Sequence, residues 1–182
     1  MSLEIYQIPE VKMALISPND YELLCRENPK SYKNTELFEG VIIEKMTKSS
    51  EHIFWKHLLS NSILKIMPQE FFLRNKDVIL IGNSELEPDI SVVVGNFLDY
   101  RNNFPTTARL VVEISISSLQ YELEKARSYA LGKVEEYWII DCKNQQIEIY
   151  TQPSEKEYLH KKILPFSEPI PLFDSTISIK TS

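Results

Sequence analysis

The chain has 182 residues, of which 43% are hydrophobic, and a formal net charge of −6. This length and apolar content suit one globular domain, or one domain with short extensions, that buries a real core. The acidic balance argues against a protein that coats nucleic acid through a broad positive face. It leaves room for an acidic site whose local field is inverted by a divalent cation.

The sequence shows no pattern for membrane insertion or export. No run approaches the roughly 20 apolar residues of a membrane span, and the start MSLEIYQIPEVKM lacks the basic and apolar regions of a signal peptide. The two cysteines, Cys25 and Cys142, are far apart and form no zinc-type pair, so we interpret them as reduced thiols. We therefore expect a soluble cytoplasmic protein with no membrane partner.

Taken in chain order, the predicted elements alternate between helices and short strands. Helix starts are predicted where Ser17, Ser49 or Ser50, and the pair Ser117-Ser118 can cap a first turn. The expected segments are an irregular lead-in (1–16), a helix (17–28), two short strands (36–46), a helix (50–67), strand material (71–81), a strand (89–94), a polar loop (96–108), a strand (109–115), a helix (117–132), strands at 136–141 and 146–150, and a short strand near 177. This order predicts an α/β (α+β) fold with a central mixed β-sheet flanked by helices.

Two of the predicted helices carry apolar stripes that indicate their buried faces. The stripes are Phe54, Leu58, Leu59, Ile63 and Ile66 in one helix, and Leu119, Leu123, Ala126 and Ala130 in the other. Lys125 lies to one side of the second stripe, where it can reach the edge of the sheet; the alternative is a simple i, i+3 partner of Glu122. His52, at the start of the first of these helices, is expected on the surface.

Two acids stand out because apolar strands surround them. Glu113 occupies the middle of a strand, on the face shared with Val111 and Ser115, and a buried carboxylate there requires a partner or a metal. Asp89 opens another apolar strand directly after Pro88. Each alone also fits an ordinary solvated position, but two acids on neighbouring strands could together hold Mg²⁺.

The ordered set of segments resembles the Uma-two family within the PD-(D/E)XK restriction-endonuclease-like superfamily. The matching stretches are ELFEGVIIEKM (36–46), SSEH (49–52), EPDISVV (87–93), VVEIS (111–115), EKA (124–126) and EYWII (136–140). The resemblance covers about residues 20–150 and implies a restriction-endonuclease-like core within a single domain over residues 1–182. Three positions depart from the pattern: Ser115 replaces the usual strand lysine, Glu122 replaces a frequent aspartate, and Lys133 replaces a small glycine.

The resemblance also implies a set of functional residues. Asp89 and Glu113 match the two acids of the superfamily motifs and are expected to hold Mg²⁺ or Mn²⁺. Lys125 matches a helix lysine that takes over from the missing strand lysine, and Glu36 matches a recurrent acid that serves as an extra metal or water ligand. These four residues are the expected catalytic set.

The activity that the resemblance implies is metal-dependent hydrolysis of phosphodiester bonds in nucleic acid, with DNA favoured over RNA. Two alternatives stay open. One is a catalytically silent nucleic-acid-binding or regulatory module on the same fold. The other is a structural homo-oligomer, with a homodimer as one candidate assembly, in which the acids are only surface groups.

Overall fold

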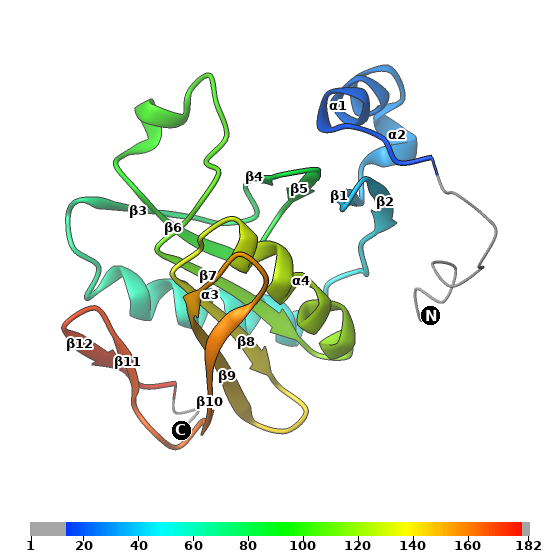
Figure 1. Cartoon of the computed structure of the whole chain (residues 1–182). Helices are drawn as coiled ribbons and strands as arrows, with labels where there is room; N and C mark the ends of the chain where they lie inside the picture. Colours follow the sequence, from blue (N-terminus) through cyan, green and yellow to red (C-terminus); the bar gives the residue numbers. More distant parts are fainter. Residues whose placement is uncertain (1–13, 180–182) are drawn as a thin grey trace.

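A six-stranded sheet forms the centre of the computed structural model, which describes residues 14–179 (Figure 1). The strand order is β10-β9-β8-β7-β6-β3, with β7 and β8 parallel and every other neighbouring pair antiparallel. The strands are β3 (Phe71–Arg74), β6 (Ile90–Val94), β7 (Leu110–Ser115), β8 (Glu136–Asp141), β9 (Gln146–Pro153) and β10 (Tyr158–Pro165). The predicted central mixed sheet is therefore confirmed.

Two helices cover opposite faces of this sheet. Helix α3 (Ser50–Leu64) packs on the face to which β7 contributes Val112 and Ile114. Helix α4 (Leu119–Leu131) packs on the other face, to which β7 contributes Val111 and Glu113. The two-residue period of β7 thus divides its side chains between two separate packing layers.

A smaller four-stranded sheet, in the order β2-β1-β5-β4, lies beside the main sheet and places Glu36 near α4. Its tight β1–β2 turn uses Gly40 with a φ of +81°, a conformation that suits glycine. The remaining elements are α1 (Pro18–Glu27), α2 (Pro29–Tyr32), β1 (Thr35–Phe38), β2 (Val41–Glu44), β4 (Ile79–Ile81), β5 (Ser84–Leu86), the 3₁₀ helix η2 (Phe97–Tyr100), β11 (Ile170–Leu172) and β12 (Ser175–Ile177).

Several local predictions are confirmed. Ser17 caps α1 in a reciprocal capping box with Asp20, and Ser49 caps α3 by accepting from the backbone of His52. Most of the expected lead-in, residues 1–13, lies outside the described residues. No helix between residues 14 and 179 is both long enough and apolar enough to cross a bilayer.

Other local predictions are wrong for identifiable reasons. Phe54 is 51% exposed and Trp55 is buried in its place, whereas the other members of the predicted α3 stripe, Leu58, Leu59, Ile63 and Ile66, lie in or against the core as expected. Ser118 does not cap α4 through its side chain; its hydroxyl donates to Glu122 instead. Strand β10 falls in the tail beyond Pro153, where an exposed run of polar residues hides the usual strand pattern.

Candidate functional site

The strand register places Asp89 and Glu113 opposite each other. Strands β6 and β7 pair Ile90 with Val112, so the residue before β6 faces the residue after Val112. The backbone N–H of Asp89 donates to Glu113 Oε2 at 3.2 Å, and the N–H of Ile114 donates to Asp89 Oδ2 at 3.0 Å. Both acids are only 3% exposed. The structure therefore brings together the two acids that the sequence singles out.

Asp89 is held by residues from α3 and the loop before it. His52 Nε2 lies 2.8 Å from Asp89 Oδ2, and the Lys48 ammonium forms an ion pair with Oδ1. Burial opposes ionisation of Asp89, but the hydrogen bond with His52 and the charge of Lys48 outweigh it and lower its pKa to about 2. Asp89 is therefore an ionised, oriented carboxylate.

The expectation that His52 lies on the surface is wrong. Its side chain is buried, and its Nδ1 has no hydrogen-bond partner among residues 14–179. His52 precedes the buried residues Trp55, Leu59 and Ile63 at spacings of three, seven and eleven residues. That spacing puts all four on one face of α3, and this signal was present in the sequence.

Lys125 lies at the centre of the second half of the site. Its ammonium contacts Glu113 Oε1 at 2.9 Å, Glu36 Oε1 at 3.1 Å and Glu122 Oε2 at 3.3 Å. Burial disfavours its charge, but the surrounding carboxylates of Glu113, Glu122 and Glu36 outweigh burial and raise the pKa of Lys125 well above its ordinary value. Lys125 therefore stays charged.

The predicted position of Lys125 on the flank of α4 is corrected by the structure. Lys125 is 3% exposed and lies on the buried face of the helix together with Glu122 and Tyr129. The predicted core stripe includes Leu123, which is only half-buried. The sequence allowed Lys125 either to pair with Glu122 or to reach the sheet. The structure shows both contacts, because Lys125 lies beside Glu122 in its own helix and beside Glu113 in β7.

Two tyrosines complete this cluster by donating to its acids. Tyr121 donates to Glu36 Oε1 at 2.7 Å, and Tyr129 donates to Glu113 Oε1 at 3.0 Å. The other oxygen of Glu36 accepts from the backbone N–H of Glu87 at 3.1 Å. Glu36 therefore lies beside Lys125, one side chain away from Glu113.

The cluster contains more acidic than basic side chains. Glu36, Glu113 and Glu122 share the single ammonium of Lys125, and all four residues are buried. Burial raises the pKa of Glu113 to about 8, against the opposing charge of Lys125. Burial also raises the pKa of Glu122, whose Oε2 lies 3.3 Å from the Lys125 ammonium but has no hydrogen-bond partner among residues 14–179. A bound cation would favour the ionised form of Glu113 in place of its proton.

The donor set suits a hard divalent cation with few protein ligands. Among residues 14–179, no group of three or more histidine, cysteine or acidic side chains converges as a ready metal site. Asp89 and Glu113 supply two carboxylates, which is the number that Mg²⁺ commonly takes from a protein while keeping water or phosphate oxygens as its other ligands. The residues therefore fit Mg²⁺ or Mn²⁺ better than zinc.

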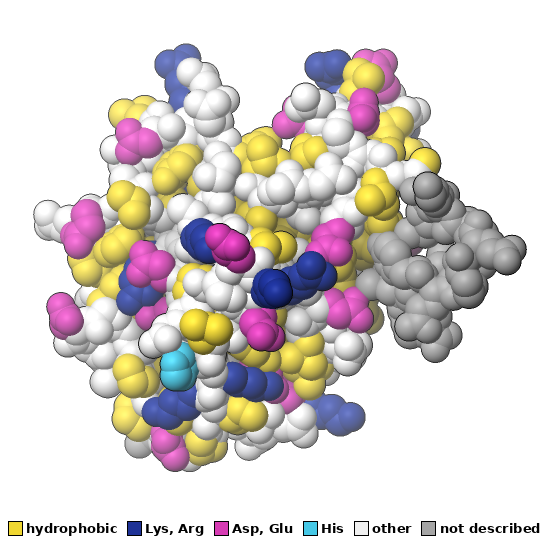
Figure 2. Space-filling model, viewed as in Figure 1, with side chains coloured by type: hydrophobic (Ala, Val, Ile, Leu, Met, Phe, Trp, Pro, Cys, Tyr) yellow, Lys and Arg dark blue, Asp and Glu magenta, His cyan; other side chains and the backbone are white. Residues whose placement is uncertain are grey.

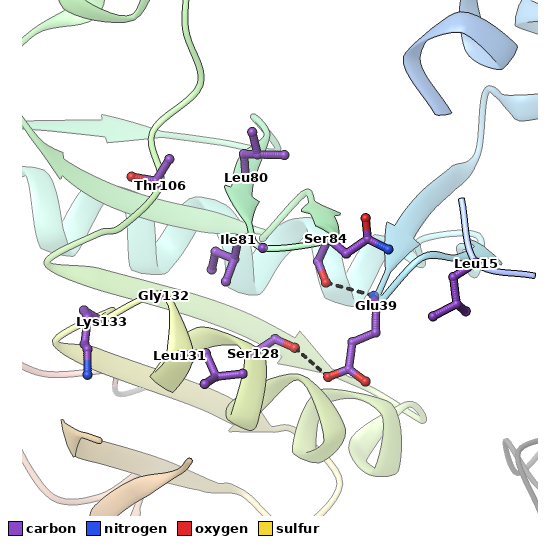
Figure 3. Close-up of a pocket in the computed structure, with 12 residues that line it drawn as sticks. Leu15, Glu39, Leu80, Ile81, Ser84, Thr106, Ser128, Leu131, Gly132 and Lys133 are labelled. Atoms are coloured by element: carbon purple, nitrogen blue, oxygen red, sulfur yellow. Dashed lines mark hydrogen bonds between the residues drawn. The ribbon is translucent and has the colours of Figure 1, made fainter. Parts of the chain in front are cut away.

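A separate hollow of about 620 Å³ lies next to α4, and neither Asp89 nor Glu113 lines it. It is lined by residues of the β4–β5 hairpin, by Ser128 and Leu131 of α4, and by Glu39 (Figure 3). Ser128 donates to the Glu39 carboxylate at 3.2 Å, which ties the β1–β2 turn to the helix. None of the four predicted catalytic residues lines this hollow, so we take Asp89 and Glu113, and not the hollow, as the candidate active site.

The face of the molecule drawn in Figure 2 carries charged side chains of both signs. On the face shown in Figure 2, basic and acidic side chains lie interspersed, with apolar side chains between them. That face therefore offers no broad basic surface of the kind that coats nucleic acid.

The fold is thus a mixed α/β fold with a central six-stranded sheet, helices on both faces and a buried pair of acids at the β6–β7 ladder. A crystal structure of a putative nuclease belonging to DUF820 from Anabaena variabilis shares this fold, with a TM-score of 0.62. The two chains are 18% identical, and the similarity covers 76% of this chain and 80% of the other.

Residues 18–179 match the Uma2 family, described as "Putative restriction endonuclease", and the chain belongs to that family. The resemblance to the Uma-two family is thereby confirmed. No curated protein matches the chain.

Four residues around the acids were not predicted as part of the site: Lys48, His52, Tyr121 and Tyr129. Tyr129 lies four residues after Lys125 and seven after Glu122, so a polar helical stripe was visible in the sequence. Lys48 lies in a loop without periodicity, and only the tertiary structure shows that it reaches Asp89.

Proposed function

We propose that this protein is a metal-dependent endonuclease that hydrolyses phosphodiester bonds of nucleic acid, with DNA as the favoured substrate. Asp89 and Glu113 hold Mg²⁺ or Mn²⁺, while Lys125 and Glu36 support the site. The observation that carries the proposal is the opposed, buried pair Asp89 and Glu113 in a family described as "Putative restriction endonuclease".

The bound cation supplies a more acidic water and stabilises charge on the phosphate. Asp89 contributes a carboxylate kept anionic by Lys48 and oriented by His52. Glu113 contributes a second carboxylate. Burial opposes the ionisation of this carboxylate, and the positive charge of Lys125 favours it. The anionic form of Glu113 is the one that can ligate a metal, so metal binding and the loss of its proton would be coupled.

Lys125 acts as a positioning residue in this proposal. Its ammonium is enclosed by Glu113, Glu36 and Glu122, so it fixes Glu113 Oε1 in place and leaves Oε2 on the side of Asp89. Glu36 holds Lys125 from β1 and is itself held by Tyr121. This preorganisation keeps the acids in one arrangement before substrate arrives.

The two competing functions predict a different environment for the acids. A structural homo-oligomer whose acids are surface groups does not need Asp89 and Glu113 buried and cross-bonded, as they are here. A silent binding module retains the same geometry without turnover, and a cleavage assay separates it from the nuclease. The cytoplasm is the proposed compartment, in keeping with Cys25 and Cys142, which form no disulfide.

The test is cleavage of supercoiled DNA, linear DNA and RNA by the full chain in Mg²⁺, in Mn²⁺ and in chelator. The variants Asp89→Asn and Glu113→Gln keep side-chain shape but remove a ligand charge, and we expect each to lower the cleavage rate by roughly 100-fold or more. Glu155→Gln, at an exposed acid of the β9–β10 hairpin, is the matched control. Thermal melts establish that the variants are folded.

Cleavage that persists in chelator, or in both folded acid variants, rejects the proposed site. A folded wild-type chain that binds nucleic acid in Mg²⁺ and Mn²⁺ without cutting it supports the silent module instead.

A further inference from the structure

One carboxylate oxygen of each acid is held by the regular elements of the fold. Asp89 Oδ2 accepts from the N–H of Ile114 in β7 at 3.0 Å and lies 2.8 Å from His52 Nε2 on α3. Glu113 Oε1 accepts from the ammonium of Lys125 on α4 at 2.9 Å. The strand and the helices therefore fix these two oxygens in place.

The remaining two oxygens are held differently. Glu113 Oε2 accepts from the backbone N–H of Asp89 at 3.2 Å. Asp89 Oδ1 is paired with the ammonium of Lys48, whose side chain comes from the loop between β2 and α3. A carboxylate oxygen has two lone pairs, and each of the other two oxygens already has two hydrogen-bond partners. A cation that binds both acids would therefore use Asp89 Oδ1 and Glu113 Oε2.

The loop that carries Lys48 is fixed at both ends. Its first residue, Lys45, donates its backbone N–H to Asn34 O at 2.7 Å and pairs its ammonium with Glu87 at 2.5 Å. Its last residue, Ser49, caps α3. The Lys48 side chain between these points is 25% exposed, and a lysine side chain is a flexible four-carbon stem. The ammonium can therefore leave Asp89 while the ends of the loop stay in place.

An ammonium and a divalent cation compete for Asp89 Oδ1 because both are positive. Their repulsion acts beside a carboxylate that is only 3% exposed, where water screens charge less than at the surface. Mg²⁺ and Mn²⁺ carry twice the charge of the ammonium and favour carboxylate oxygens as ligands. Within residues 14–179, Asp89 is the one acid that forms an ion pair with Lys48, so a single ion pair opposes the exchange.

We propose that Lys48 is an internal stand-in for the metal: its ammonium occupies Asp89 Oδ1 in the metal-free chain and is displaced when Mg²⁺ or Mn²⁺ binds. This inference rests on the metal site of the proposed function and assigns the residue that controls its occupancy. The exchange leaves the buried Asp89 carboxylate paired with a positive charge in both states, which avoids an uncompensated buried ion. It also lowers the apparent metal affinity, because the metal must break the ion pair before it binds.

The test is calorimetric titration of Mn²⁺ into the full chain after treatment with chelator and dialysis. We expect Lys48→Met to tighten the apparent Kd roughly tenfold, the effect of removing one charged hydrogen bond that competes with the metal. Lys48→Arg keeps the competing charge and should bind Mn²⁺ with nearly the wild-type Kd.

Lys45→Met is the matched control, because it removes a positive charge from the same loop. The Lys45 side chain is 23% exposed, close to the 25% of Lys48, but its partner is Glu87 and not a proposed metal ligand. We expect its Kd for Mn²⁺ to stay within about twofold of wild type, since its charge is already paired. Equal tightening in Lys45→Met and Lys48→Met would reveal a general effect of charge and overturn the proposed exchange.

A second measurement uses the wild-type chain alone. Amine-reactive labelling, followed by peptide mass analysis, compares the chain in chelator with the chain in saturating Mn²⁺. Lys48 should react several-fold faster in Mn²⁺, because the ion pair no longer holds its ammonium. Lys45 should react equally in both conditions, and Lys125, which is 3% exposed, should stay unreactive in both.

The outcomes separate this exchange from the nuclease itself. Cleavage by wild type, combined with an unchanged Kd in Lys48→Met and unchanged labelling of Lys48, overturns the exchange alone. Tighter Mn²⁺ binding in Lys48→Met and faster labelling of Lys48 in wild type, without cleavage by wild type, support the exchange and reject the nuclease. A wild-type chain and a folded Lys48→Met that both fail to bind Mn²⁺ overturn the exchange together with the metal site.

Discussion

The two faces of strand β7 have the same backbone but very different chemistry. Toward α3, the strand presents Leu110, Val112 and Ile114 to an apolar layer that includes Leu59. Toward α4, the same strand presents Glu113 to Lys125, in a layer where buried acids, a lysine and tyrosines contact one another. The first face is built for packing, and the second pairs packing with a preorganised charged cluster.

This difference shows where the stability and the proposed activity reside. Apolar contacts are non-directional, so a truncation on the α3 side should affect folding more than chemistry. The charged cluster depends on each partner, because removal of one ion leaves the others buried without compensation. The two faces should therefore respond differently to single substitutions.

The largest effect is expected from Lys125→Met. The substitution keeps an apolar stem but leaves Glu36, Glu113 and Glu122 without their shared ammonium, so we expect it to lower the free energy of unfolding by about 3 kcal/mol. Cleavage per folded molecule should also fall by roughly 100-fold. Urea unfolding and cleavage assays on the same preparation measure both quantities. Wild-type stability in this variant would contradict the role assigned to the cluster.

A matched substitution on the other face is Leu59→Ala. Leu59 is fully buried in the apolar layer, and its truncation should lower the free energy of unfolding by about 2–3 kcal/mol through lost burial and a cavity. Cleavage per folded molecule should stay near the wild-type value, because Leu59 packs within the apolar cluster on the α3 side of the sheet. A loss of cleavage as large as that in Lys125→Met would show that the two faces are not separable.

A smaller and graded effect is expected from pH. Glu113 has a pKa raised mainly by burial, from 4.5 to about 8, so it binds its proton more tightly in the folded chain. Its contribution to stability is complete below about pH 4.5 and is lost as the pH rises through 8. Asp89 behaves in the opposite way: its pKa is lowered from 3.8 to about 2, so its contribution is present above pH 3.8 and is lost as the pH falls through 2.

The pH prediction is checked by unfolding and by Mn²⁺ titration between about pH 4.5 and 8. Wild-type stability should decrease across this window while apparent Mn²⁺ affinity increases, because the metal needs the deprotonated carboxylate. Glu113→Gln should flatten the stability profile. If wild type and Glu113→Gln show the same dependence of stability on pH, the raised pKa of Glu113 is not the cause of that dependence.

Much of the fold could be predicted from local patterns in the sequence. Ser17 and Ser49 mark helix starts because their side chains satisfy free N–H groups of the first turn, and the structure shows both caps. The alternation in residues 109–115 predicts a strand with two faces, which β7 confirms. Strand β10 was missed because it is an exposed edge strand with His160, Lys161 and Lys162 in its centre.

The candidate site could be predicted only in part. Asp89, Glu113 and Lys125 were singled out by their positions in the predicted strands and helix as well as by the family resemblance, and Glu36 by the resemblance alone. The structure places the four residues in one network; their catalytic roles stay predictions. The buried polar face of α4 could not be read from hydrophobic periodicity, because that method assigns apolar residues to the core.

The most direct test of the central claim is a crystal of the full chain soaked with Mn²⁺ and measured at a wavelength where manganese scatters anomalously. We predict one anomalous peak in contact with carboxylate oxygens of both Asp89 and Glu113, and no such peak in Glu113→Gln. A well-ordered site without a peak, or a peak that contacts neither acid, would contradict the assignment of these residues as the metal ligands.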